Sequence, residues 1–142
     1  MSCSTVEPSS DRIRKVRILI ADDYDAIRTV VRSTIKSNPD FEVCGEARDG
    51  VEAIEEARRL KPDVVVLNIS MPKLNGFAAA RKIRQELPEA AIVILSSNID
   101  KRFVEEASKI GAKAYVSKTK ATESLVKAIG EALEGREFVV VE

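Results

Sequence analysis

The sequence contains no histidine and no tryptophan, only two cysteines, and 4% aromatic residues. Without histidine, Ser-His-Asp and Cys-His nucleophile systems are excluded, and so is a Cys/His metal site. Cys3 lies in a polar N-terminal stretch and Cys44 in an apolar segment, a placement that argues against a structural disulfide. Any chemistry must therefore be sought among carboxylates, amides, hydroxyls and lysines.

The sequence also lacks an excess of either charge and any long apolar run. Lys plus Arg and Asp plus Glu each number 23, so there is no electrostatic reason to expect direct binding to nucleic acid or to a membrane. No apolar run approaches the roughly 18–20 residues that a transmembrane helix needs, and the N-terminus has no apolar core of the signal-peptide kind. At 142 residues, we expect one cytoplasmic domain with a sizeable core.

Apolar runs of strand length alternate with segments of helical periodicity after a polar tail, which is predicted over residues 1–14. The predicted strands are residues 16–21, 41–47, 64–67, 91–95 and 114–117. Helical patterns follow them at residues 27–35, 49–60, 76–87, 101–110 and 122–133. Continuous Val/Ile/Leu strands that alternate with helices indicate a parallel sheet covered on both faces. We expect an α/β fold with a five-stranded, doubly wound, flavodoxin-like (βα)5 sheet in three layers.

Local signals support the element boundaries. Asp49-Gly-Val-Glu52 has the D-x-x-E form of a capping box, and Gly111 provides a left-handed helix stop. The domain is predicted over residues 15–134, followed by a tail or truncated linker over 135–142. This last segment contains the apolar run F-V-V-V, which could pack back on the domain, pair with another chain, or mark the start of a linker.

The strand ends carry the polar residues of interest, because ligands of such sheets gather beyond the carboxyl ends of the strands. Two adjacent carboxylates, a hydroxyl and a lysine suit a small hard cation together with a phosphoryl group. Each residue also has a plainer interpretation: the acidic pair could cap the next helix, the serine could form a turn, and the lysine could be a solvated charge. Their joint placement favours a site made of Asp22, Asp23, Asn68, Ser96 and Lys118.

These residues resemble the receiver domains of bacterial two-component response regulators. Asp22-Asp23 match the family's acidic pair, S-M-P-K-L-N-G (70–76) matches its loop after the phosphoacceptor, and A-K-A-Y (112–115) holds the aromatic switch residue Tyr115. Ser96 matches the switch Ser/Thr, and Lys118 matches the invariant lysine. The stretch I-A-D-D-Y-D-A-I-R (20–28) looks most like regulators with a C-terminal helix-turn-helix output domain. The chain ends where the linker to such a domain would begin, so we expect no output domain in this segment.

The resemblance implies a phosphorelay role. In the family, a histidine kinase supplies a phosphoryl group to an aspartate at the end of the third strand. Mg²⁺ is held by the acidic pair, the acceptor and a backbone carbonyl, which here are Asp22, Asp23, Asn68 and the carbonyl of Ser70. The switch residues, here Ser96 and Tyr115, then move and reshape a partner-binding surface. Tyr115 could instead be a half-buried aromatic at a strand edge. The implied partners are a histidine kinase or another signalling protein, with a homodimer possible.

Position 68 departs from the family, because the aligned phosphoacceptor is Asn68 and not an aspartate. A neutral carboxamide oxygen is a poor nucleophile, so we expect no phosphoryl transfer to this residue. We also expect Mg²⁺ binding to be weakened or lost, because one negative charge is missing. Two origins fit the sequence: a natural degenerate receiver, or an engineered Asp-to-Asn form of an ordinary one.

Two other classes of function are less well supported. A small α/β phosphatase or hydrolase would need Asp22 or Asp23 as its nucleophile, but the M-P-x-x-N-G loop and the motif spacing disfavour it. A nucleotide-binding module would need a glycine-rich phosphate loop, and neither G-x-G-x-x-G nor G-x-x-x-x-G-K-[ST] is present.

Overall fold

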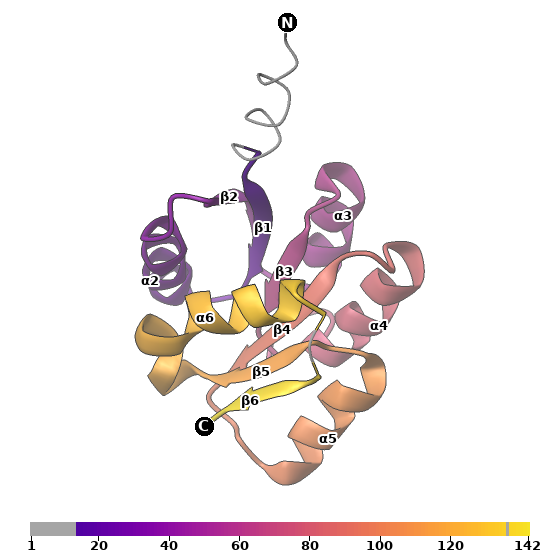
Figure 1. Cartoon of the computed structure of the whole chain (residues 1–142). Coiled ribbons are helices and arrows are strands. Elements are labelled where there is room, and N and C mark those ends of the chain that lie inside the picture. The colour runs from indigo at the N-terminus through magenta and orange to yellow at the C-terminus, as the bar shows by residue number, and fades with distance from the viewer. Residues whose placement is uncertain (1–13, 136) are drawn as a thin grey trace, which may run out of the picture.

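The structure, a computed structural model, describes residues 14–135 and 137–142. Most of the predicted N-terminal tail, residues 1–13, lies outside this range. The described residues form a parallel sheet of six strands in the order β2-β1-β3-β4-β5-β6, shown in Figure 1. The strands are β1 (Val16–Ala21), β2 (Phe41–Ala47), β3 (Val64–Leu67), β4 (Ala91–Ser96), β5 (Ala114–Ser117) and β6 (Val139–Val141).

Helices cover both faces of the sheet (Figure 1). On one face lie α2 (Asp25–Lys36) and α6 (Ala121–Leu133), the latter preceded by the short 3₁₀ helix η1 (Lys118–Lys120). On the other lie α3 (Gly50–Leu60), α4 (Gly76–Glu86) and α5 (Lys101–Ile110). The predicted three-layer, doubly wound α/β fold is confirmed. None of the helices in the described range is long and apolar enough to cross a membrane.

The predicted local signals act as expected. Every residue of β3 is buried, which fits its continuous apolar sequence. The Asp49 carboxylate accepts a hydrogen bond from the Glu52 backbone N–H at 2.8 Å, and the Glu52 carboxylate accepts one from the Arg48 N–H at 2.7 Å. This arrangement is a variant of the capping box, because the second acceptor reaches one residue further back than usual. Gly111 ends α5 with φ of 100°.

The prediction of five strands is corrected by β6. Residues 139–141, which we expected in a tail or linker, pair in parallel with β5 so that Val139 lies beside Ala114 and Val141 beside Val116. The physical reason is that β5 would otherwise leave an open edge, and β-branched valines suit a strand that fills it. Val139 and Val141 also pack against the core layer that contains α6. Of the three possibilities for the C-terminal apolar run, the structure shows it packed back on the domain.

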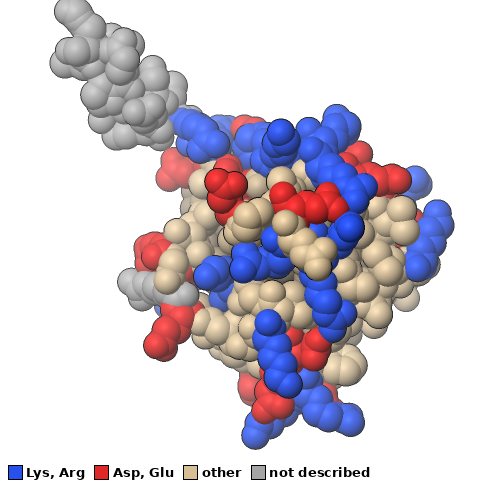
Figure 2. Space-filling view, turned by 90° about the vertical axis from the view of Figure 1, so that its right-hand side faces the viewer, with Lys and Arg blue, Asp and Glu red and all other residues tan. Residues whose placement is uncertain are grey.

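Charges of both signs mix over the face formed by α3, α4 and α5 (Figure 2). Ion pairs join neighbouring helices, since Arg58 of α3 contacts Glu86 of α4 at 2.5 Å and Arg81 of α4 contacts Glu106 of α5. The hydrogen bond from Arg58 lowers the pKa of Glu86 to about 2. Exposed pairs of this kind contribute little stability, so the apolar layers beneath them hold the helices in place.

Two glycines give a matched test of packing around the loop after β3. A Cβ on Gly76 would lie 2.1 Å from the backbone oxygen of Asn68, whereas a Cβ on Gly130 inside α6 would have, among the described residues, no neighbour within 4 Å beyond the adjoining residues and backbone of its own helix. We expect Gly76→Ala to lower the free energy of unfolding by about 1–3 kcal/mol through overpacking. Gly130→Ala should raise it by about 0.5–1 kcal/mol through better helix propensity. Urea unfolding of both variants checks this, and equal effects would contradict the packing account.

Candidate functional site

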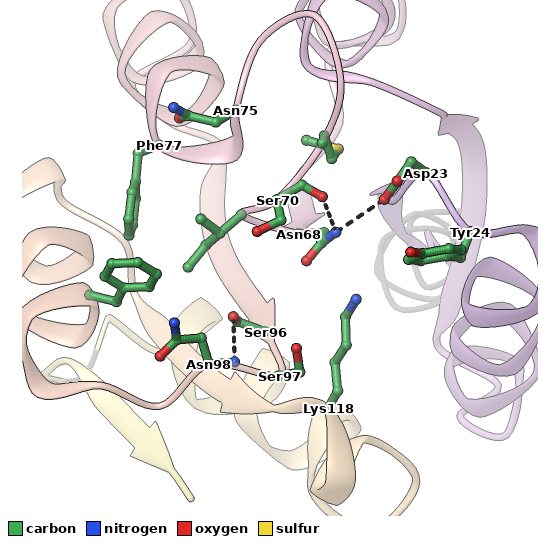
Figure 3. Close-up of a pocket in the computed structure, with 13 residues that line it drawn as sticks. Asp23, Tyr24, Asn68, Ser70, Asn75, Phe77, Ser96, Ser97, Asn98 and Lys118 are labelled. Carbon is green, nitrogen blue, oxygen red and sulfur yellow. Dashed lines mark hydrogen bonds between the residues drawn. The ribbon is translucent and has the colours of Figure 1, made fainter.

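The loops that follow β1, β3 and β4, together with the start of η1, surround a cavity of about 690 Å³ at the carboxyl ends of the strands (Figure 3). This is the end of the sheet where β1, lying between β2 and β3, marks the reversal of strand order, and where ligands of open α/β sheets bind. The residues that line the cavity are Asp23, Tyr24, Asn68, Ile69, Ser70, Met71, Asn75, Phe77, Ser96, Ser97, Asn98, Phe103 and Lys118.

The Asn68 side chain is hydrogen-bonded within the cavity. It follows β3 directly and is only 5% exposed. Its Nδ2 donates to Asp23 Oδ1 at 3.3 Å and to the Ser70 carbonyl at 2.8 Å, and Figure 3 shows the amide lying between these two groups. Both partners are acceptors, so they fix the orientation of the amide: its nitrogen faces them and its oxygen faces away.

Asp22 lies behind the cavity lining and is paired with Lys118. The carboxylate is 2% exposed, and its Oδ2 lies 2.9 Å from Lys118 Nζ. Oδ2 makes no well-directed hydrogen bond among the described residues, so this contact is an ion pair in which charge attraction dominates. Asp22 Oδ1 accepts from the Tyr24 backbone N–H at 3.0 Å. Lys118 itself points into the cavity (Figure 3), with its charge compensated from behind.

A buried arginine holds the backbone of the acidic pair. Arg28 of α2 donates from Nη1 to the Asp22 carbonyl at 2.6 Å and from Nε to Glu46 of β2 at 3.1 Å, and it also pairs with Asp25. The alternative that the acidic pair caps α2 is not observed: the N-cap is Tyr24, and it makes no side-chain capping hydrogen bond within the described part of the chain.

Ser96 and Tyr115 both bind the backbone of Asn98 in the loop after β4. The Ser96 hydroxyl accepts from the Asn98 N–H at 3.0 Å, and the Tyr115 hydroxyl donates to the Asn98 carbonyl. Ser96 thus forms a turn and also faces the cavity. Tyr115 is fully buried in the core layer beneath α3, α4 and α5, away from the cavity lining and not half-buried at a strand edge. Burial raises the pKa of its phenol, against an opposing hydrogen bond with Ser96.

The cavity therefore brings together Asp23, Asn68, Ser70, Ser96 and Lys118. Asp22 joins them through its ion pair with Lys118, and Tyr115 is linked to them through Ser96 and the backbone of Asn98. The polar residues lie at the strand ends where the sequence predicts them.

The cavity also has an aromatic part that was not predicted from the sequence. Tyr24, Phe77 and Phe103 line it together with the polar residues, and so does Asn98. The two phenylalanine rings pack edge to face with centroids 5.8 Å apart, joining the first turns of α4 and α5. Their position in the sequence could have indicated this role. Each phenylalanine lies in the first turn of a helix that follows a strand, on the side of the sheet where the strand ends gather.

The residues expected to hold Mg²⁺ offer oxygen donors of the kind that a hard cation prefers. The fit is incomplete, because Asn68 presents N–H groups to the Asp23 and Ser70 oxygens that would contact the ion. In the described chain, no cluster of three or more His, Cys, Asp or Glu residues could hold a metal. With an aspartate at position 68, the same place would carry three carboxylates.

The family comparison decides the identity of the domain. The model described as "Response regulator receiver domain" matches residues 18–130. The chain belongs to the response regulator receiver family. The family and the sheet of parallel strands together make this a receiver domain of two-component signal transduction.

Several known proteins contain a segment similar to the chain. Transcriptional regulatory protein DegU of Brevibacillus brevis is 32% identical over 125 residues, covering 88% of this chain and 53% of that protein. A protein-glutamate methylesterase/protein-glutamine glutaminase of Pyrococcus abyssi is 48% identical over 81 residues, 57% of this chain and 22% of that protein. The receiver thus spans about half the length, or less, of these relatives.

Solved structures give the same result. A LuxR-family two-component response regulator from Aurantimonas sp. SI85-9A1 has a TM-score of 0.83 and 35% identity, over 87% of this chain and 89% of that one. The receiver domain of the putative response regulator NarL from Mycobacterium tuberculosis has a TM-score of 0.81 and 31% identity, over 87% of this chain and 99% of that one. The receiver therefore shares its fold with regulators of the LuxR type.

The raised pKa of Tyr115 predicts a loss of stability in alkaline solution. Below pH of about 10 both folded and unfolded chains keep the phenolic proton. Above it the unfolded chain loses the proton first, so the free energy of unfolding falls until the pH passes the folded pKa. Urea unfolding at increasing pH should show this fall in the native receiver and in Tyr24→Phe, whose tyrosine is 63% exposed. Tyr115→Phe should show a smaller fall; an unchanged one would refute the assignment.

Proposed function

We propose that this receiver takes part in two-component signalling without accepting a phosphoryl group at Asn68, and that it acts by binding a partner in one fixed state. The observation that carries the proposal is the double hydrogen bond of the Asn68 amide to Asp23 and to the Ser70 carbonyl. Receivers of LuxR-type regulators are signalling domains and not enzymes, and this role needs no turnover.

The chemistry of the amide supports the loss of phosphoryl acceptance. An acyl phosphate forms when a carboxylate oxygen attacks phosphorus, and a neutral amide oxygen is a far weaker nucleophile. The Asn68 nitrogen also faces the position from which the cation would approach, so the amide must turn over before its oxygen can act as a ligand. Breaking its two hydrogen bonds opposes that turn.

The proposed cation ligands are Asp22, Asp23, the Asn68 amide oxygen and the Ser70 carbonyl. Replacing an aspartate by Asn68 removes one attraction to the ion, worth about 3 kcal/mol at ~5 Å and an effective dielectric near 20 before screening. It also removes repulsion between carboxylates when the ion is absent. We therefore propose weak Mg²⁺ binding and a pocket that is stable without the ion.

The other polar residues take the roles that their positions in the family imply. Lys118 and Ser96 face the cavity, where they would contact a phosphoryl group in a competent receiver. Tyr115 couples the loop after β4 to β5 through Asn98. The proposed partner is a histidine kinase or another signalling protein in the cytoplasm.

A phosphatase with an Asp22 or Asp23 nucleophile is less well supported by the geometry. Asp22 is buried behind the cavity lining against Lys118. Asp23 accepts the Asn68 amide. Neither carboxylate therefore stands free to attack a substrate in the cavity.

Treatment with acetyl phosphate tests the proposed function directly. The native chain should keep its mass, whereas Asn68→Asp should gain one phosphoryl group in the presence of Mg²⁺, because a carboxylate nucleophile is restored. Asn75→Asp is the matched control: it places a new carboxylate on the cavity wall away from the acceptor position and should gain nothing. Intact-mass measurement followed by peptide mapping checks this. A stoichiometric adduct on native Asn68 would end the proposal.

Thermal melting with and without Mg²⁺ tests the state of the pocket. In metal-free buffer the native receiver should melt at a higher temperature than Asn68→Asp, because the amide removes carboxylate repulsion and satisfies two acceptors. Added Mg²⁺ should raise the melting temperature of Asn68→Asp much more than that of the native chain. If the native chain were the less stable one without metal, the amide would not stabilise the pocket.

A further inference from the structure

The connection from β5 through α6 to β6 differs in hand from the other crossovers of the sheet. The connections through α3, α4 and α5 use one face and progress from β2 toward β5, and the connection through α2 uses the other face and runs the opposite way, from β1 to β2. These four connections therefore share one hand. The helix α6 lies on the same face as α2, yet its connection continues onward from β5 to β6 (Figure 1).

This geometry makes β5-α6-β6 a left-handed crossover. Parallel strands joined through a helix are connected right-handedly in about 98% of cases, because strand twist and helix packing agree only in that hand. The connection that completes this crossover runs from the end of α6 at Leu133 to the start of β6 at Val139. In that short connection Gly135 adopts φ of 74°, the left-handed conformation that favours glycine.

The contacts of the strand itself are favourable. The Val139 N–H donates to the Lys113 carbonyl at 3.1 Å, and the strand pairs in register with β5. Val139 and Val141 pack on the layer with α6, while Phe138 packs on the layer with α4 and α5. The edge of β5 is therefore an apolar groove that accepts a parallel strand with side chains on both faces.

The strand is a small element at the margin of the sheet. It is three residues long and forms the outer edge of the sheet, and Val140 is 40% exposed. Leu133, at the end of α6 beside the connection, is also 40% exposed. A short connection between a helix and an edge strand is the condition that favours exchange of the strand between identical chains.

We propose that the groove along β5 is a self-association site, filled reciprocally by residues 138–141 of a second copy of this chain. Each copy then gives its β6 to its partner and receives the same strand in return. All contacts of the strand are kept, and no single chain needs the left-handed crossover. The occupant is the segment that the structure already shows in the groove. This inference stands independently of the proposed function, because it uses no residue of the polar cavity.

The molar mass of the intact chain in solution, from low micromolar to near-millimolar concentration, tests the exchange by light scattering after size exclusion. We expect the mass to double from the monomer value of 15.6 kDa as concentration rises. Insertion of a flexible Gly-Ser stretch after Gly135 should return the chain to a monomer, because a long connection lets β6 fold back on its own domain. The melting temperature of this variant should confirm that it remains folded.

Valine variants locate the interface. Val139→Asp combined with Val141→Asp should abolish the dimer, because both side chains fill the groove, while Val51→Asp on the exposed surface of α3 should leave it unchanged. A native chain that stays monomeric throughout would overturn the proposal. A dimer that survives the lengthened connection or the double substitution would also overturn it, since it would have to use another surface.

Discussion

The hydrogen bonds of the Asn68 amide determine the state of the polar cavity. In a receiver with three carboxylates, oxygens of like charge face one another, and a cation is needed to bring them close. Here Nδ2 supplies two donors to two of those oxygens, on Asp23 and on the backbone of Ser70. The second carboxylate, on Asp22, is already compensated by Lys118. The charges and donors of the pocket are thus satisfied mainly within the protein.

The surrounding contacts hold these groups in place. Arg28 fixes the backbone of Asp22 from α2 and β2. Gly76 allows α4 to approach the backbone of Asn68 more closely than any side chain would permit. On the far side, the two hydrogen bonds to Asn98 tie the loop after β4 both to Ser96 and to β5. The loops after β1, β3 and β4 are therefore anchored to the sheet by contacts within the protein, as the proposed binding in one fixed state requires.

Most of the fold could be predicted from the sequence, because the local signals at the ends of the helices agree with the hydrophobic pattern. The N-cap at Asp49 and the helix stop at Gly111 are examples. The sequence also predicted which strand ends bear polar groups, since topology alone gathers them. It did not predict the partners of those groups. Arg28 lies in a helix where an arginine is usually solvated, and its burial follows from tertiary packing with Glu46. The inward placement of Phe77 and Phe103 likewise depends on how α4 and α5 pack together.

The sixth strand is the one element for which local and global preferences disagree. Its valines suit a strand, and the edge of β5 offers both hydrogen bonds and apolar contacts. The chain reaches that edge, however, by a crossover whose hand opposes the twist of the sheet. In natural sequences the local preferences of each segment usually agree with the overall fold. A segment in which they conflict is therefore a place where we expect another arrangement of similar free energy. The groove makes the same contacts with β6 whichever chain supplies the strand. The proposed exchange of β6 between two chains therefore keeps these contacts and removes the left-handed crossover.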